Sequence, residues 1–195
     1  MVATASSIPP RPVVLSYEDL RTMPEDGRRY EILEGELCVT PAPTTSHQFI
    51  SRNLVVLLQS HVGAQGLGEV LQAPTDVILD PHTVVEPDLF FVSNARLDII
   101  SERGIEGAPD LVIEVLSPAT EKRDRGAKQH LYARYGVAHY WLVDGAARGV
   151  TERVLRGNTY EVRGTYHAPS SFRSALFPDL SIDLASVFAR PTSAR

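Results

Sequence analysis

Cysteine is scarce in this 195-residue chain, which contains only Cys38. A single cysteine excludes a disulfide framework and a cysteine-rich zinc cluster, and it fits a reducing compartment. Long apolar runs are missing as well, since no stretch approaches the roughly 20 residues of a membrane helix. Near the N-terminus, Pro9, Pro10 and Pro12 interrupt the segment in which a signal peptide would need an apolar core. We therefore expect a cytoplasmic protein with no membrane partner.

Several catalytic signatures are also missing. The sequence has no G-x-S-x-G elbow, and its six histidines form no H-x-x-x-H pair or other zinc spacing. The glycines at 63–68 follow a helix-like segment and lack the order G-x-G-x-x-G. Serine hydrolases, zinc enzymes and dinucleotide-binding proteins are therefore disfavoured.

Excess positive charge is another feature that the chain lacks. Its formal net charge of −5 argues against a protein that coats nucleic acid nonspecifically. A local basic cleft is still compatible with a chain that is acidic overall. With 43% hydrophobic and 22% charged residues, the chain has enough apolar material for a core. The Ser-, Thr- and Pro-rich residues 1–15 predict a flexible N-terminal arm, and residues 16–195 predict a single domain.

Periodicity predicts short strands and helices along the chain. Ser16 is expected to cap a helix at 17–20, and Gly136 to end a helix that follows Ser117 as its N-cap. The other expected elements are strands at 30–33 and 36–39, a helix at 46–62, strands at 70–72, 75–79, 88–92 and 110–116, a helix at 119–135, a strand at 140–143 and a hairpin of 150–155 with 160–162. From residue 168 onward the sequence predicts mostly loop.

Glu114 stands inside the apolar run 111–116. A run that is apolar on both faces is typical of a central strand covered on each side. A carboxylate that is buried without a partner costs several kcal/mol or more, so Glu114 requires a partner.

A second acid, Asp88, follows Pro87 at the start of the strand-like run 88–92. If the two strands are neighbours, Asp88 and Glu114 converge. Two carboxylates held close together repel each other unless a proton or a cation lies between them. A hard divalent ion with oxygen ligands is the simplest such cation at neutral pH. The sequence therefore predicts a Mg²⁺ or Mn²⁺ site at Asp88 and Glu114.

The helix after Glu114 carries a candidate amine, Lys128. Spacing of three and four residues places Lys128 on one helix face with Asp124, Leu131, Tyr132 and Tyr135. A lysine above a core-facing surface reaches for an anion. Near a bound metal ion it would orient the attacking water or stabilise the charge on a phosphoryl group, so we expect Lys128 to be catalytic.

Each of these residues also has a structural interpretation. Asp88 could cap a turn, Glu114 could pair with Arg123 or Arg125, and Lys128 could extend to water. Two carboxylates could also serve a glycosidase, but the lysine favours phosphoryl chemistry. The order of an acid, a second acid and a lysine along two strands and a helix favours a catalytic site.

At these residues the chain resembles the Uma2 family of putative restriction endonucleases, a branch of the PD-(D/E)XK nuclease superfamily. The resemblance covers about residues 28–145. The matching pieces are 30-YEILEGEL-37, 43-PTTSHQ-48, 86-EPDLFFV-92, 109-PDLVIEVLSPAT-120, Asp124, Lys128, Tyr132 and 136-GVAHYWLVD-144.

The resemblance implies an α/β fold with a restriction-endonuclease-like core, in which α-helices flank a mixed central β-sheet. It implies that 16–195 form one PD-(D/E)XK nuclease-like domain. Asp88 would be the acid of the PD element, and Glu114 would be the acid of the ExK element. The carbonyl of Val115 would complete the metal ligands.

The chain departs from the superfamily pattern two residues after Glu114, where Leu116 replaces the usual lysine. The resemblance implies that the following helix supplies the missing amine, which here is Lys128. It also raises the expectation of an additional acid from the N-terminal part, either Glu31 or Glu34.

The leading functional hypothesis is a metal-dependent endonuclease that hydrolyses phosphodiester bonds in DNA. The alternative is a noncatalytic binding or regulatory module that retained the nuclease scaffold, because the net charge is acidic and no basic DNA-reading element is obvious. A homodimer is expected because cutting both DNA strands needs either two active sites or two successive binding events at one active site. Residues 139–143, with the neighbouring hairpins, are the candidate surface for it.

Overall fold

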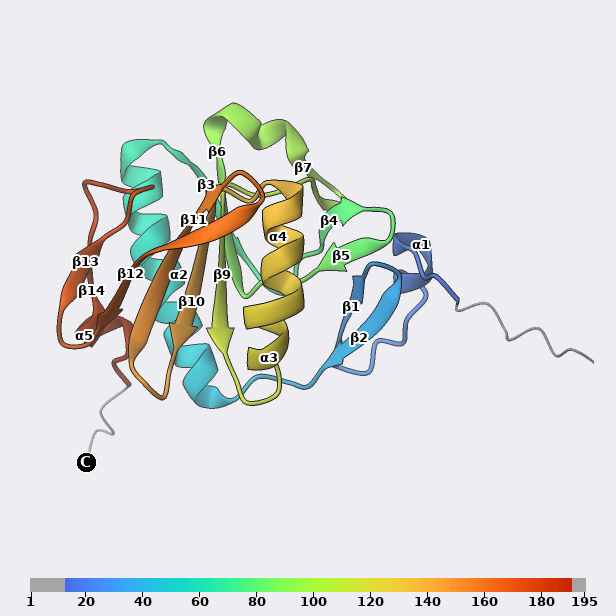
Figure 1. The fold of residues 1–195 in the computed structure, drawn as a ribbon, viewed down its shortest axis with the longest axis horizontal. Coiled ribbons are helices and arrows are strands. Elements are labelled where there is room, and N and C mark those ends of the chain that lie inside the picture. Colours follow the sequence, from blue (N-terminus) through green and yellow to red (C-terminus); the bar gives the residue numbers. More distant parts are fainter. Residues whose placement is uncertain (1–12, 191–195) are drawn as a thin grey trace, which may run out of the picture.

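A computed structural model describes residues 13–190 and shows two large sheets with helices around one of them (Figure 1). The first twelve residues of the expected N-terminal arm lie outside the described residues. Among the described ones, no helix is long and apolar enough to cross a membrane. The elements are α1 (Tyr17–Leu20), β1 (Arg29–Leu33), β2 (Glu36–Thr40), α2 (Thr45–Gln65), β3 (Gly68–Gln72), β4 (Val77–Asp80), β5 (Thr83–Val85), β6 (Leu89–Ser93), a 3₁₀ helix (Asn94–Ile99), β7 (Ile100–Ser101), β8 (Gly104–Glu106), β9 (Leu111–Leu116), α3 (Glu121–Arg123), a π-helical turn (Asp124–Lys128), α4 (Gln129–Tyr135), β10 (His139–Asp144), β11 (Gly149–Arg156), β12 (Thr159–His167), β13 (Ser171–Arg173), β14 (Ser181–Asp183) and α5 (Leu184–Val187).

The central sheet has the strand order β12-β11-β10-β9-β6-β3. Strands β9 and β10 are parallel, whereas the other neighbouring strands of this sheet are antiparallel. The expected α/β class with a mixed central sheet is therefore confirmed. The sequence did not predict the second sheet, β2-β1-β5-β4-β8-β7, because it joins the N-terminal hairpin to short strands with little periodicity.

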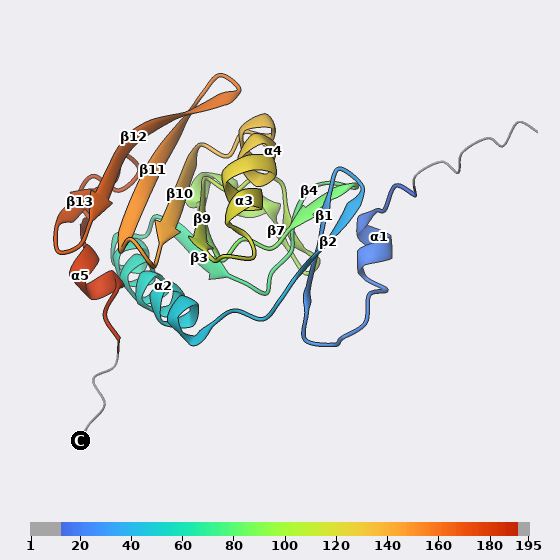
Figure 2. The same ribbon diagram turned by 60° about the horizontal axis from the view of Figure 1, so that its bottom comes forward.

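Helices cover both faces of the central sheet. Figure 2 shows α2 on one face and the α3–α4 segment on the other. Side chains of β9 alternate between these two layers, as a strand requires. Leu111, Ile113 and Val115 belong to the apolar cluster under α2, whereas Val112 belongs to the cluster under α4. By this alternation Glu114 projects toward α4.

Local sequence signals explain the helix boundaries. Ser16 caps α1 with a capping box, and the helix covers the residues expected. At the start of α2, the Thr44 hydroxyl accepts a hydrogen bond from the His47 amide at 3.3 Å. Gly66 ends this helix with a φ of 59°, in the left-handed region that glycine enters without steric cost. The predicted helix at 46–62 is therefore confirmed, with a few additional residues at its ends.

The helix predicted at 119–135 is interrupted. Ser117 is not its N-cap, because residues from Ser117 to Thr120 form a turn in which the Thr120 amide donates to the Ser117 carbonyl at 3.1 Å. Helical structure begins at Glu121, and the residues from Asp124 to Lys128 form a π-helical turn. Such turns occur mostly as single insertions in α-helices and are frequent at functional sites.

One expectation is refined and one needs correction. The tail from residue 168 is mostly loop, as expected, but it also contains a short hairpin of β13 with β14, and α5 follows directly. The segment 139–143 is not a surface for dimer contacts. Its four residues from Tyr140 to Val143 are at most 1% exposed, because β10 lies between β9 and β11 inside the sheet.

Candidate active site

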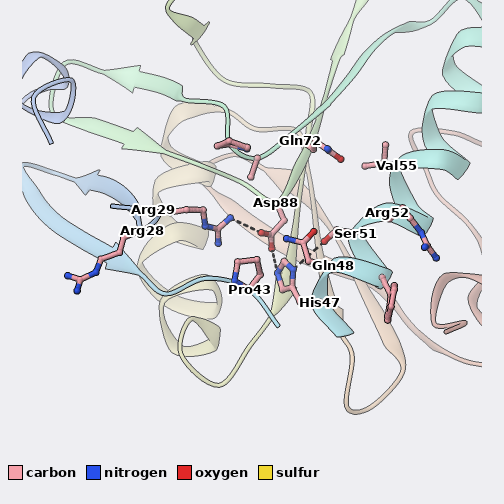
Figure 3. A pocket seen from close by; sticks show the side chains of 14 residues that line it. Arg28, Arg29, Pro43, His47, Gln48, Ser51, Arg52, Val55, Gln72 and Asp88 are labelled. Atoms are coloured by element: carbon pink, nitrogen blue, oxygen red, sulfur yellow. Dashed lines mark hydrogen bonds and ion pairs between the residues drawn. The ribbon is translucent and has the colours of Figure 1, made fainter. Parts of the chain in front are cut away.

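Asp88 lies immediately before β6, and its carboxylate is held by three groups. Arg29 donates to Oδ1 at 3.0 Å, and the His47 ring nitrogen Nε2 lies 3.0 Å from Oδ2. The backbone amide of Val115 donates to the same Oδ2 at 2.9 Å. Figure 3 shows the carboxylate between Arg29 and His47. Asp88 therefore does not act as a simple turn cap.

The environment of Asp88 favours its ionised form. Burial acts to raise the pKa of this carboxyl, since the side chain is only 6% exposed. The hydrogen bond and charge of His47, the Arg29 guanidinium and the Val115 amide together outweigh burial and hold the pKa below its usual value. Asp88 is thus a carboxylate near neutral pH.

Glu114 is 2% exposed and receives two hydrogen bonds on one oxygen. Lys128 Nζ donates to Oε1 at 2.9 Å, and the Tyr132 hydroxyl donates to Oε1 at 2.7 Å. No hydrogen bond from another described residue reaches Oε2. Burial raises the pKa of Glu114 to about 8, and the carboxylates of Asp124, Asp88 and Glu31 add to the increase that Lys128 opposes. Unlike Asp88, Glu114 therefore takes up a proton more easily than an ordinary glutamate does.

Lys128 is the cation of this cluster and is itself 2% exposed. Its Nζ lies 2.6 Å from Glu31 Oε1 and 2.9 Å from Glu114 Oε1. Burial alone would lower the pKa of Lys128, but Glu114, Glu31 and Asp124 raise it above its ordinary value. The ammonium form is thus fixed between carboxylates, and Lys128 does not extend to water.

Glu31, rather than Glu34, joins this cluster. Glu31 on β1 is 2% exposed and also accepts a hydrogen bond from the Glu86 amide at 2.9 Å. Glu34 is on the surface, where it pairs with Arg134 at 2.5 Å. The strand periodicity of the β1–β2 hairpin could have distinguished them, because Glu34 lies in the turn and Glu31 lies within the strand.

The expected structural partners of Glu114 bind elsewhere. Arg123 lies 3.3 Å from Glu31, and Arg125 pairs with Glu121 at 2.8 Å. Glu114 therefore has a lysine and a tyrosine as partners instead of an arginine.

Strand register brings Asp88 and Glu114 together. The ladder between β6 and β9 ends at the pair Leu89 and Ile113, and the Asp88 side chain continues it by accepting from the Val115 amide. Asp88, at the start of β6, and Glu114, within β9, therefore lie on neighbouring strands, and the charge of Asp88 contributes to the raised pKa of Glu114. Lys128 reaches Glu114 from the succeeding helical segment, as the sequence predicted.

The donor chemistry at this point suits a hard divalent cation. Two carboxylates and a backbone carbonyl are oxygen ligands of the type that Mg²⁺ accepts. Glu114 Oε2 has no hydrogen-bond donor among the described residues, so one ligand oxygen is available. Within residues 13–190, no group of three or more His, Cys, Asp or Glu side chains has the arrangement of a metal site. The predicted set needs only two such side chains and the Val115 carbonyl.

A cavity of about 730 Å³ opens beside Asp88. Its wall includes Arg28 and Arg29 near β1, His47 and Arg52 from α2, and Asp88 itself. In Figure 3, Arg28 and Arg52 lie on opposite sides of the carboxylate. The candidate site is therefore reachable from solvent on the Asp88 side, whereas Glu114 and Lys128 lie in the interior.

Comparison with known proteins places this site in a family. Residues 17–185 match the Uma2 family, described as "Putative restriction endonuclease". The chain belongs to the Uma2 family. An uncharacterized protein of Synechocystis sp. is 31% identical over 144 residues, which are 73% of this chain and 74% of that protein.

A solved structure has a similar fold to this Uma2 protein. It is the crystal structure of a putative nuclease belonging to DUF820 from Anabaena variabilis, with a TM-score of 0.74 and 20% sequence identity. The match covers 89% of this chain and 97% of that chain. The expected fold class and the membership of a family described as putative restriction endonucleases are thereby confirmed.

Three residues of this Uma2 site were not identified as site residues from the sequence. Arg29, His47 and Tyr132 each contact one of the two acids. His47 lies in the matching piece 43–48, and Tyr132 shares the helix face of Lys128, so the signals were present. Arg29 gave no signal, because its contact depends on a pairing of β1 that the sequence does not reveal.

Tyr132 offers a test of the charge on Glu114. Replacing Tyr132 with phenylalanine removes a 2.7 Å hydrogen bond to a buried acid and should lower the free energy of unfolding by about 1.5–3 kcal/mol. The control is Tyr160→Phe, because the Tyr160 hydroxyl donates to the neutral carbonyl of Val137, also at 2.7 Å. This control should cost about 1 kcal/mol in urea unfolding. Equal losses in the two variants would contradict a special role of the Glu114 contact.

Proposed function

We propose that this Uma2 protein is a metal-dependent DNA endonuclease that hydrolyses phosphodiester bonds. The observation that supports it best is the convergence of three groups. Asp88 and Glu114 stand on neighbouring strands, and Lys128 Nζ lies 2.9 Å from Glu114. The family description of putative restriction endonucleases agrees with this chemistry.

Asp88, Glu114 and the Val115 carbonyl would hold Mg²⁺ or Mn²⁺. When bound, the ion would neutralise charge on the phosphate and help to activate the attacking water. Asp88 is suited to this role because its depressed pKa keeps it ionised. Glu114 is buried with a raised pKa, so a cation there would favour its charged form over its protonated form.

Lys128 would orient the attacking water and balance negative charge on the phosphate. Its ammonium is already held by Glu31 at 2.6 Å, so its position does not depend on the substrate. Donors placed in advance where charge develops cost little reorganisation during reaction, which makes them effective in catalysis. Tyr132 fixes the Glu114 carboxylate by its hydrogen bond to Oε1.

A second candidate function is a noncatalytic binding module. It is favoured by the fact that both acids already have cationic protein partners, with Arg29 and His47 at Asp88 and Lys128 at Glu114. Such pairs can complete a structural core without any metal ion. Metal binding distinguishes the two candidates, because only the endonuclease needs it.

Asp88→Asn tests the proposed function directly. The neutral amide should lower the rate of plasmid cleavage in Mg²⁺ or Mn²⁺ by about 100-fold or more, because it removes one charged ligand. Titration calorimetry should show divalent metal binding in the unmodified protein and its loss in the variant. The matched control is Asp98→Asn, an exposed aspartate on the 3₁₀ helix.

Two results would contradict the endonuclease. One is an unmodified protein that binds neither ion and leaves plasmid, linear duplex and single-stranded DNA intact. The other is a cleaving preparation in which Asp88→Asn and Asp98→Asn are equally active, which would indicate a contaminating nuclease.

A further inference from the structure

Positive charge is concentrated around the cavity beside Asp88. Arg28, Arg29 and Arg52 all line this 730 Å³ space, and Asp88 is the only acidic residue among its lining residues. The formal net charge of the chain is −5, so such a concentration is local. This cavity is therefore a candidate for the basic DNA-contacting element that the sequence did not reveal.

A second cavity, of about 550 Å³, extends the same basic character. It shares His47 and Phe49 with the first cavity, so the two adjoin at the first turns of α2. Arg148, from the turn between β10 and β11, and Arg190, after α5, line it. No acidic residue is among its lining residues. We call Arg28, Arg29, Arg52, Arg148 and Arg190 together the basic track.

Most arginines of the basic track keep their charge available to a ligand. Arg52 is exposed and contacts the neutral amide of Asn53 at 2.8 Å, and Arg190 donates to the Ser46 hydroxyl at 2.8 Å. Arg148 is exposed and forms no ion pair with another described residue. Only Arg28 and Arg29 pair with acids. Arg28 lies 3.5 Å from Asp26, and Arg29 is the partner of Asp88.

We infer that the basic track binds the phosphodiester backbone of duplex DNA on both sides of Asp88. The inference rests on the proposed function, and it assigns the substrate-binding surface of that site. Charge complementarity supports it, because arginine forms bidentate hydrogen bonds with phosphate oxygens. Ser46, where Arg190 binds, and Arg52 are separated by about 9 Å along the helix axis. That length is enough for the basic track to meet more than one phosphate of a DNA strand.

Binding of a labelled DNA duplex without cleavage tests the basic track. Fluorescence anisotropy in EDTA, over a series of NaCl concentrations, measures the affinity and its salt dependence. The variants are Arg52→Gln, Arg148→Gln and the double variant. The control is Arg156→Gln, which removes the same charge from an exposed arginine on β11 outside both cavities. All three substituted sites are on the surface, so the four variants should fold.

Each basic-track variant should weaken binding several-fold and reduce the salt slope by about one, because one phosphate contact is lost. The double variant should bind about tenfold more weakly at low salt, and Arg156→Gln should bind as the unmodified protein does. Affinities of Arg52→Gln and Arg148→Gln equal to that of the control would overturn the inference. So would the absence of any DNA binding, or tighter binding of RNA duplex than of DNA duplex.

The outcomes separate this inference from the proposed function. If the protein cleaves DNA but neither track variant changes binding, the endonuclease stands and the basic track is wrong. If the variants weaken binding as expected while no metal ion supports cleavage, the basic track stands and the endonuclease is wrong.

Discussion

Glu114→Gln is expected to lower the rate of DNA cleavage by about 1,000-fold or more while the protein stays folded. The proposed role of Glu114 needs a negative charge next to the metal ion, and an amide cannot supply it. The fold, in contrast, needs only an acceptor. The glutamine oxygen can accept from Lys128 and Tyr132, as Oε1 does now, and its NH₂ group takes the place of Oε2.

The stability of this variant should differ from that of the unmodified protein in a pH-dependent way. In the folded state the pKa of Glu114 is about 8, above its ordinary value of 4.5. A raised pKa means that folding favours the protonated acid, so its contribution to stability is fully present below pH 4.5 and is lost as pH rises through 8. Glutamine does not titrate, so metal-free Glu114→Gln should become the more stable protein as pH increases across this window.

Urea unfolding in EDTA at several pH values, with cleavage assays beside it, measures both effects. Glu34→Gln is the control, because Glu34 is an exposed acid paired with Arg134 and lies outside the cluster. It should leave cleavage unchanged. A Glu114→Gln protein that cleaves DNA at a rate within tenfold of the original would remove Glu114 from the proposed mechanism.

Lys128→Met is expected to lower the free energy of unfolding by about 3–5 kcal/mol and to abolish cleavage. Removal of one partner from a buried ion pair leaves the other charges uncompensated, which is among the costliest single changes in a core. Here the partners left behind are Glu31 and Glu114, both 2% exposed. Methionine fills similar space without charge, so the loss of stability would be caused mainly by the missing positive charge.

The chain provides a close control for this change. Its two lysines are Lys122 and Lys128, on the same helical segment, and Lys122 is exposed. Lys122→Met should change the unfolding free energy by less than about 0.5 kcal/mol. A similar small effect of both variants would show that Lys128 is not a structural cation of the cluster.

The sequence predicted those parts of the site that depend on local patterns. Glu114 stands out because a charge interrupts an apolar strand, and the spacing on the following helix selects Lys128. The path of β1 could not be predicted, because a short antiparallel hairpin gives no information on which sheet it joins. Arg29, which contacts Asp88, consequently appeared only in the structure. Glu31 was one of two expected acids, and only the structure selects it over Glu34 by its contact with Lys128.

Contacts between side chains that lie far apart in the sequence were equally hidden. His47 reaches Asp88 across 41 positions of sequence, and only the arrangement of α2 against the sheet brings them together. The π-helical turn that carries Lys128 was missed for a different reason. Its residues have ordinary helix-forming composition apart from Gly126, so the sequence predicts a continuous α-helix there.

The Asp88 carboxylate occupies the place where a backbone carbonyl would otherwise continue the ladder between β6 and β9. The spacing of the two acids is thus set by the same hydrogen-bonded framework that holds the core strands. Loop fluctuations elsewhere cannot pull these acids apart. The candidate site loses its alignment when these two interior strands separate, so the geometry of the two acids and the integrity of the fold are lost in one event.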